Sequence, residues 1–172
     1  NFSDIVGTFE IKNISGNINK IIVVNGPGSF TGIRIGVTIA KVMAWSLNIP
    51  ITTISSLDAM AVSNSKDLYK IPVIDARRNS SYFSIYDKNN NLIVENKYTT
   101  NEYILECISN LDGKYEIISN ETEINDRNIT AYNPDLLLIV NKFQNKECEN
   151  PHNINPLYLK LTEAEENKNG GN

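Results

Sequence analysis

The sequence predicts an α/β fold in which short strands alternate with helices. The chain has 172 residues, 41% of them hydrophobic, which is enough for one domain or two small lobes with a real core. The run Ile21–Val24 is short, continuous and β-branched, as in a buried parallel strand. The residues after it have helical apolar spacing, and a second β-rich run follows. Strand, helix and strand in this order predict a right-handed crossover.

Local signals mark where each early element begins and ends. Ser29 is the expected N-cap of the long helix, and Asn48 followed by Pro50 ends it. Ser55 or Ser56 starts the next helix. The expected elements are, in order, a helix over 2–9, a strand over 21–24, a helix from 30 to 47, a strand over 49–54 and a helix that ends at 64–66.

The second half of the chain is richer in strands. Three β-rich runs with short loops predict an antiparallel meander, and Asn101 and Asn133 are the expected N-caps of two later helices. Pro134 and Asp135 fit the first turn of the second helix. The expected elements are strands over 71–76, 81–86 and 92–94, a helix from 101 to 108, a strand over 115–119, a helix ending at 143 and a strand over 156–161.

The change in character near residues 66–70 divides the chain into two predicted lobes. Residues 1–66 form the rest of an N-terminal lobe with the glycine-rich helix, and residues 67–162 form the second lobe. The polar tail 163–172 is expected to be disordered. The chain begins with Asn inside a helical pattern, so we expect the sequence to be N-terminally truncated.

The composition of the chain excludes several classes of function. A net charge of −4 argues against broad binding of phosphate backbones by this chain alone. Cys107, Cys148 and His152 are too few and too scattered for a structural zinc site or a nucleophilic triad, so no metal is expected. The N-terminus is not a signal peptide, and we expect no membrane span of about 20 apolar residues. A cytoplasmic protein is predicted.

The glycine-rich segment Asn25–Ala44 follows a strand and opens a helix, which is the arrangement of an anion site. It fits neither the Walker A spacing nor GxGxxG, because its glycines are spaced GxGxxxG. An anion contact through the backbone of Ser29 and Thr31 and the side chain of Arg34 stays open.

Small residues recur every four positions in this segment, which on a helix makes one ridge with little side chain. Glycine within a helix costs about 1 kcal/mol relative to alanine, so the repeat indicates close packing. The partner is either this chain's own sheet or first helix, or a helix of another subunit. The ridge consists of Gly28, Gly32, Gly36, Ala40 and Ala44.

Three stretches resemble one protein family. They are GPGSFTGIRIG at 26–36, IPVIDARRNSSYFSIYD at 71–87 and PLYLK at 156–160, where Lys160 replaces the usual Arg. The family is TsaB, also called YeaZ. The resemblance is close over about residues 20–87 and rests on element order alone over 90–151. It implies an actin-like, sugar-kinase-like ATPase fold of two lobes, here without the strand pair that opens the first lobe.

The resemblance also implies a function. TsaB-like proteins are dimerisation subunits in the synthesis of threonylcarbamoyladenosine in tRNA, and they lack the metal-binding histidines of the catalytic paralogue TsaD. We therefore expect a non-catalytic subunit without a cofactor of its own, with ATP and metal on partner subunits. The expected partners are a TsaD-like paralogue, a TsaE-like ATPase, a second copy of this chain, and tRNA through the complex. The expected partner interface comprises Phe2, Ile5, Val6, Phe9, Gly28, Gly32, Gly36 and Ala40.

Two alternative functions are enzymatic. In an ATPase or phosphotransferase of the same fold, Asp75 would be the metal-binding or catalytic carboxylate and Arg34 a phosphate contact. A peptidase is disfavoured because no metal site or triad can be assembled. The adjacent Arg77 and Arg78 are either a solvated turn or a contact for tRNA or for a partner's carboxylates.

Overall fold

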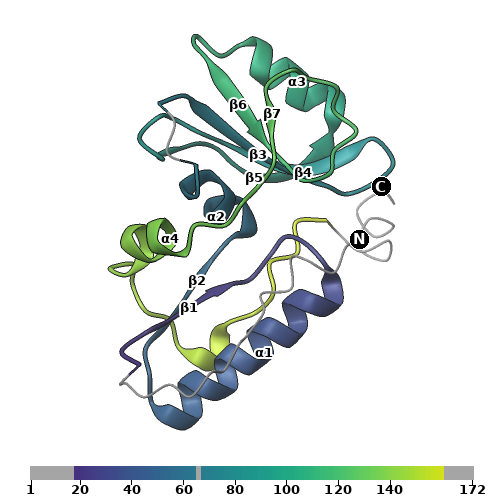
Figure 1. Ribbon diagram of the computed structural model, residues 1–172. Coiled ribbons are helices and arrows are strands. Elements are labelled where there is room, and N and C mark those ends of the chain that lie inside the picture. The colour runs from purple at the N-terminus through teal and green to yellow at the C-terminus, as the bar shows by residue number, and fades with distance from the viewer. Residues whose placement is uncertain (1–17, 65–66, 161–172) are drawn as a thin grey trace, which may run out of the picture.

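The computed structural model describes residues 18–64 and 67–160, which form two sheets with a short helix, α2 (Ser56–Val62), between them (Figure 1). The smaller sheet pairs β1 (Ile21–Val24) with β2 (Ile51–Ile54) in parallel. The larger sheet has the order β5-β4-β3-β6-β7. Its strands are β3 (Tyr69–Asp75), β4 (Ser80–Tyr86), β5 (Leu92–Thr100), β6 (Tyr115–Ile118) and β7 (Ile129–Thr130).

The predicted strand–helix–strand unit is confirmed. Helix α1 (Phe30–Leu47) connects the two parallel strands and covers one face of their sheet (Figure 1). Ser29 caps it, with its Oγ accepting from the Gly32 amide at 3.4 Å. Asn48 ends it in the left-handed conformation, φ 53°, which Asn tolerates better than most residues. Strand β2 begins two residues later than predicted because the Ile49 amide still donates to the Ala44 carbonyl at 2.9 Å and Pro50 has no N–H.

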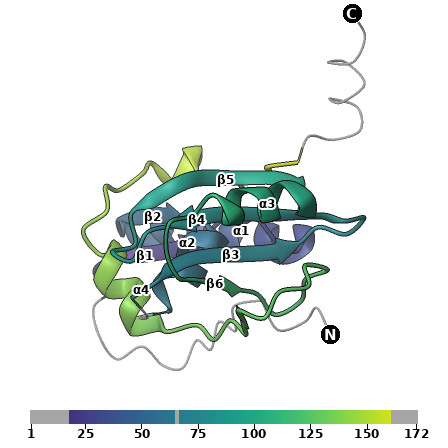
Figure 2. The ribbon, with the colours of Figure 1, turned by 90° about the horizontal axis from the view of Figure 1, so that it is seen from above.

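The antiparallel meander β3-β4-β5 is also confirmed, and Figure 2 shows its strands side by side next to β6. Strand β5 continues to Thr100, six residues beyond the predicted end at Val94. A register shift opposite Ser84 interrupts the alternation of inward and outward side chains in β5. Because β5 is an edge strand with many polar residues, its second half has no hydrophobic pattern that predicts a strand. The two-residue strand β7 gives no sequence signal.

Three helices cover the remaining faces. Helix α3 (Asn101–Ser109) packs on the outer face of the larger sheet, where Ile104 and Ile108 join its main core. Helix α2 fills the other face with Leu57 and Met60. Helix α4 (Leu136–Phe143) packs through Ile139 against the smaller sheet and α2.

Two expected helix caps and one expected strand are wrong. Thr100, not Asn101, caps α3, because its Oγ1 accepts from the Tyr103 amide. Asp135, not Asn133, caps α4 and accepts from the Leu138 amide at 3.0 Å. Residues 156–160 form no strand: they follow the short 3-10 helix η2 (Pro151–Asn153) and touch the β1 end through one bond from the Leu157 amide to the Asn25 carbonyl, 2.7 Å.

Candidate partner interface

Helix α1 is apolar on two sides, and within the described residues only one of these sides packs against the rest of the chain. Val37, Ala40 and Ala44 are buried against the smaller sheet. Opposite them, Ile35, Ile39 and Val42 follow each other at i, i+4 and i+7 and are 53%, 37% and 56% exposed. These three residues are called the α1 outer face. A contiguous exposed apolar stripe of this kind is typical of a protein interface.

The small-residue ridge divides between these two sides. Gly28 precedes the helix, and Ala40, expected at a partner interface, is only 1% exposed and belongs to the core. That part of the expectation is wrong, because Ala40 and Ala44 let α1 approach its own sheet closely. Gly32 and Gly36 are half-buried. A Cβ on Gly36 would meet no atom of the described residues within 4 Å, so the space beside this glycine is open there.

The turn before α1 fixes where the helix starts. Gly26 has φ +111°, and a Cβ there would lie 3.0 Å from Ile33 Cδ1 and 3.1 Å from the Leu157 carbonyl oxygen. Only glycine fits this conformation and this contact. The Gly26 carbonyl also accepts from the Ser56 amide at 2.8 Å, so the same turn holds the start of α2.

By length and composition α1 is also long enough to span a membrane, with mean hydropathy 1.2 over 18 residues. One such helix is weak evidence, because the core helix of a soluble protein passes the same test. Arg34 and Lys41 lie within this window, and an interior charge is costly in a bilayer. The packing of Val37, Ala40 and Ala44 on the smaller sheet is that of a helix in a protein core.

The β3–β4 turn carries the expected carboxylate and arginines. Asp75 ends β3, and its Oδ1 is buried without a hydrogen-bond partner among the described groups. Arg77, Arg78 and Asn79 have φ values of 65°, 55° and 56°, three left-handed residues in succession. The left-handed region costs about 1–2 kcal/mol per non-glycine residue, and such strain often accompanies function. Both arginines are exposed.

Hydrogen bonds to α3 and to the loop between β6 and β7 hold this strained turn. The Asn79 amide donates to Glu123 Oε2 at 2.9 Å, and its side chain donates to Glu102. Ser81 Oγ donates to Asn101 Oδ1 at 2.7 Å. A bond from the backbone amide of Glu102, followed by the one from Asn79, lowers the pKa of the Glu102 carboxyl.

The expected anion contacts do not form one cluster. Ser29 uses its Oγ to cap α1, Thr31 is exposed, and Arg34 lies on α1 beside the smaller sheet. Asp75 lies on the larger sheet. Phe2, Ile5, Val6 and Phe9 lie outside the described residues. Within the described residues, no group of three His, Cys, Asp or Glu could hold a metal ion.

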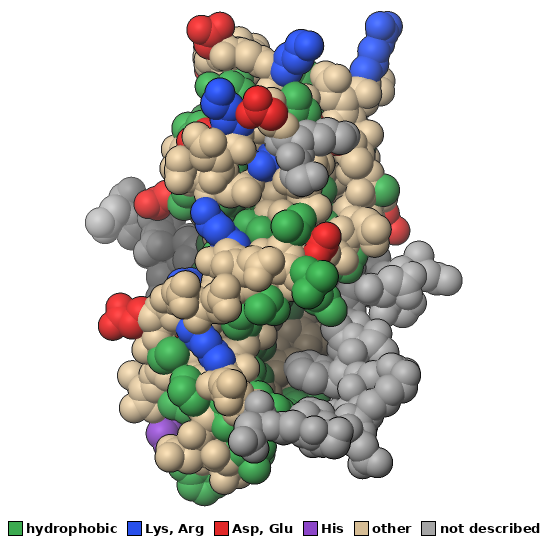
Figure 3. Space-filling view, turned by 60° about the vertical axis from the view of Figure 1, so that its left-hand side comes forward, with side chains coloured by type: hydrophobic (Ala, Val, Ile, Leu, Met, Phe, Trp, Pro, Cys, Tyr) green, Lys and Arg blue, Asp and Glu red, His purple; other side chains and the backbone are tan. Residues whose placement is uncertain are grey.

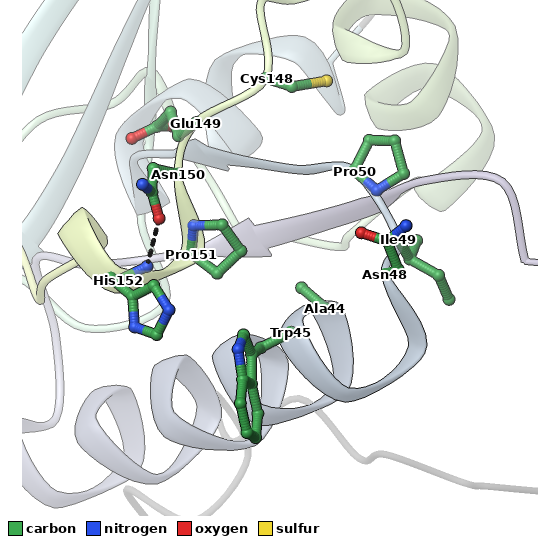
Figure 4. Close-up of a pocket in the computed structure, with 10 residues that line it drawn as sticks. All are labelled: Ala44, Trp45, Asn48, Ile49, Pro50, Cys148, Glu149, Asn150, Pro151 and His152. Atoms are coloured by element: carbon green, nitrogen blue, oxygen red, sulfur yellow. Dashed lines mark hydrogen bonds between the residues drawn. The ribbon is translucent and has the colours of Figure 1, made fainter.

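Two surface features were not foreseen. A pocket of about 670 Å³ lies where α1 ends, with the Trp45 and His152 rings 6.3 Å apart (Figure 4). Its Glu149 carboxylate is already bound to the Thr53 amide and hydroxyl at 2.7 and 2.6 Å. Leu136 and Leu137 of α4 are 72% and 77% exposed, and Figure 3 shows apolar side chains at mid-height, at the level of α4.

Comparison with known proteins identifies the family. The family model described as TsaD, tRNA N6-adenosine threonylcarbamoyltransferase, matches residues 8–132. The tRNA threonylcarbamoyladenosine biosynthesis protein TsaB of Bacillus subtilis (strain 168) is 33% identical over 166 residues, which cover 87% of this chain and 72% of that protein. The chain belongs to the TsaB (YeaZ) family.

Another TsaB protein, from Buchnera aphidicola subsp. Acyrthosiphon pisum, is 31% identical over 162 residues, covering 82% of this chain and 73% of that one. YeaZ from Pseudomonas aeruginosa has a similar fold, with a TM-score of 0.61 at 17% identity over 81% of this chain and 74% of that chain. The structure of an uncharacterized Pseudomonas aeruginosa protein with similarity to peptidase YeaZ has a TM-score of 0.66 at 18% identity. The match covers 83% of this chain and 74% of that chain. The resemblance to TsaB and the α/β fold are confirmed, and the fold fits the actin-like, sugar-kinase-like class.

Proposed function

We propose that this chain is a non-catalytic scaffold subunit that supports a TsaD-like catalytic paralogue in the threonylcarbamoylation of the tRNA adenosine next to the anticodon. Membership of the TsaB family supports a role in threonylcarbamoyladenosine biosynthesis. The α1 outer face is the observation that carries the scaffold role. A helix that leaves Ile35, Ile39 and Val42 in water gains stability when a partner covers them.

The open space beside Gly36 can accept a helix of the partner. Two helices pack when the ridge of one enters the groove of the other, and a missing side chain lets the backbones approach closely. The TsaD-like paralogue is the proposed occupant, with a second copy of this chain as the competing one. ATP and metal are assigned to partner subunits, including a TsaE-like ATPase, in a cytoplasmic complex. The two sheets are proposed to be the two lobes of the actin-like fold.

Gly36→Leu tests the proposal because it should make the isolated chain more stable and its complex with the partner weaker. Within the chain, the new side chain enters open space, and a helix-favouring residue replaces glycine, so the free energy of unfolding rises by about 0.5–1 kcal/mol. At the interface, overpacking costs about 1–3 kcal/mol, which lowers the affinity by roughly 5- to 150-fold. Urea unfolding and titration of the purified TsaD-like partner measure the two effects. Unchanged partner affinity would reject the interface.

A matched pair of charge variants supplies the control. Ile35 of α1 and Ile93 of β5 are 53% and 50% exposed. Ile35→Asp places a charge on the α1 outer face and should abolish co-elution with the partner, because a buried unpaired charge is costly. Ile93→Asp should leave co-elution intact. Equal behaviour of the two variants would show that α1 is not the docking surface.

One observation favours a second candidate, a nucleotide-dependent phosphotransferase. Asp75 Oδ1 is buried without a partner at a strained turn, as a metal-binding carboxylate would be. Calorimetric titration with Mg²⁺ and ATP tests it. Binding that Asp75→Asn removes would favour the enzyme, and absence of heat at millimolar nucleotide would exclude it.

A further inference from the structure

Positive and negative charges are segregated in this chain. The net charge is −4, yet no Asp or Glu occurs from residue 11 to residue 57, a stretch that includes Lys20, Arg34 and Lys41. The segment 150–160 also has no acidic residue but carries His152 and Lys160. The fold brings these two acid-free segments together, since α1 packs against η2. A local positive surface therefore exists on an acidic protein.

A cleft of about 410 Å³ lies between α1 and the segment 154–158. It is called the α1 basic cleft. Five of its lining side chains can donate hydrogen bonds, and none of the described residues that line it is acidic. The donors are Arg34, Thr38, Lys41, Asn155 and Tyr158.

The two cations of the cleft are held in place without being neutralised. Lys41 Nζ donates to the carbonyl oxygens of Ile154 at 2.6 Å and His152 at 3.4 Å, which fix its position but carry no full charge. The Arg34 guanidinium lies 5.0 Å from the centre of the Phe30 ring, which contacts the Tyr158 ring. In residues 18–64 and 67–160, neither cation forms an ion pair with a carboxylate, so both charges are available to an anion.

We propose that the α1 basic cleft binds a backbone phosphate of RNA. Arg34 supplies a planar fork of donors, Lys41 a point charge, and Thr38 and Tyr158 hydroxyls, which together match a phosphate oxygen cluster. The inference rests on the proposed function, since the substrate of that complex is a tRNA. The new element of the proposal is that this subunit itself contacts the RNA, through a local positive site that is not evident from the net charge of the chain.

The geometry lets the cleft and the α1 outer face act together. Arg34 and Ile35 are consecutive, so they point about 100° apart around the helix axis. A partner docked on the α1 outer face leaves the cleft at the rim of the assembly, where RNA held by the partner can reach it. Phosphate contacts position the nucleic acid without reading sequence.

The test uses the full chain, alone and with its TsaD-like partner, and a fluorescent anticodon stem–loop. The variant Arg34→Gln/Lys41→Gln is compared with Lys88→Gln/Lys114→Gln, which removes two exposed lysines of the other sheet's loops. We expect the cleft variant to bind RNA about tenfold more weakly and to lower the salt slope by about 1.5, with the control unchanged. Arg34→Gln alone, which keeps the Lys41 tether, should show part of the loss.

Four results would overturn the inference. Unchanged RNA binding by the cleft variant shows that phosphate does not enter. An equal loss in the control shows only a general charge effect. Loss of partner co-elution shows that the cleft belongs to the protein interface. If the cleft variant loses the binding of inorganic phosphate but still binds RNA, the cleft is a site for small anions. Failure of the proposed function is seen separately, as absence of a partner complex in the wild type, and the RNA titration of the chain alone still decides the cleft.

Discussion

Tyr86 Oη donates a hydrogen bond of 2.7 Å to Asp58 Oδ1 and so connects the larger sheet to α2. The same carboxylate completes the capping box of α2, because its Oδ2 accepts from the Ser55 amide at 2.9 Å while Ser55 Oγ accepts from the Asp58 amide. Burial and the nearby negative charge raise the pKa of the Tyr86 hydroxyl, which keeps its proton on the oxygen and available to Asp58.

Tyr86→Phe should lower the free energy of unfolding by about 1.5–3 kcal/mol, the range for a buried hydrogen bond to a charged group. Tyr86 is only 3% exposed, so water cannot replace the lost donor. Urea unfolding followed by far-UV circular dichroism measures the change. Tyr103→Phe, at a hydroxyl-bearing ring that is 38% exposed, is the control and should change stability by less than about 0.5 kcal/mol. Equal midpoints for the two variants would mean that the Tyr86–Asp58 bond contributes nothing.

Asp135→Ala should cost about 1 kcal/mol, because Asp135 is the N-cap of α4. Asn133→Ala should be nearly neutral, although the sequence pattern Asn-Pro-Asp marks Asn133 as the cap. Both residues are exposed, so burial does not complicate the comparison. The same unfolding experiment measures both, and a larger loss at Asn133 would place the helix start where the sequence predicted it.

The sequence predicts the β1–α1–β2 unit because its signals are local. Ser29 and Asn48 bracket one helix, and the β-branched strands on either side are short and continuous. The family resemblance rests on the same stretch. At α4 the prediction placed the cap at Asn133 and Asp135 in the first turn, and it was wrong because Asp135 itself is the cap.

The exposed apolar face of α1 could not be predicted from periodicity alone. An apolar residue occurs on almost every side of this helix, and only the packing of Ala40 and Ala44 shows which side the chain uses itself. The Tyr86–Asp58 bond joins residues 28 positions apart and leaves no pattern in the sequence. The same holds for the α1 basic cleft, whose two walls are more than a hundred residues apart.

Arg78→Gly should raise the free energy of unfolding by up to about 1.5 kcal/mol. Arg78 has φ 55° and an exposed side chain, so glycine relieves about 1–2 kcal/mol of left-handed strain and costs about 0.5–1 kcal/mol of chain entropy. Lys114→Gly, at an exposed residue without positive φ, has only the entropic cost and should be destabilising. Thermal unfolding compares the two, and destabilisation by Arg78→Gly would mean that the arginine side chain stabilises the turn.

The last prediction concerns Lys70, a lysine of β3 that is only 1% exposed. Its Nζ donates to Asn90 Oδ1 at 2.6 Å and to the Lys88 carbonyl at 3.4 Å, which holds the β4–β5 turn against the start of β3. Burial lowers the pKa of its ammonium below 10.5, against the opposing attraction of Asp87. Between the folded pKa and 10.5 the unfolded chain therefore binds more protons, and the Lys70 contribution to stability rises with pH.

Lys70→Met removes that titration and keeps a side chain of similar length. The free energy of unfolding of the wild type minus that of Lys70→Met should increase as the pH is raised from 8 towards 10.5, the ordinary lysine pKa. Taking the difference cancels the tyrosines, whose raised pKa values act in the opposite direction at alkaline pH. Urea unfolding at a series of pH values measures it. A difference that stays constant would show that the Lys70 ammonium is as well solvated in the folded protein as in the unfolded chain.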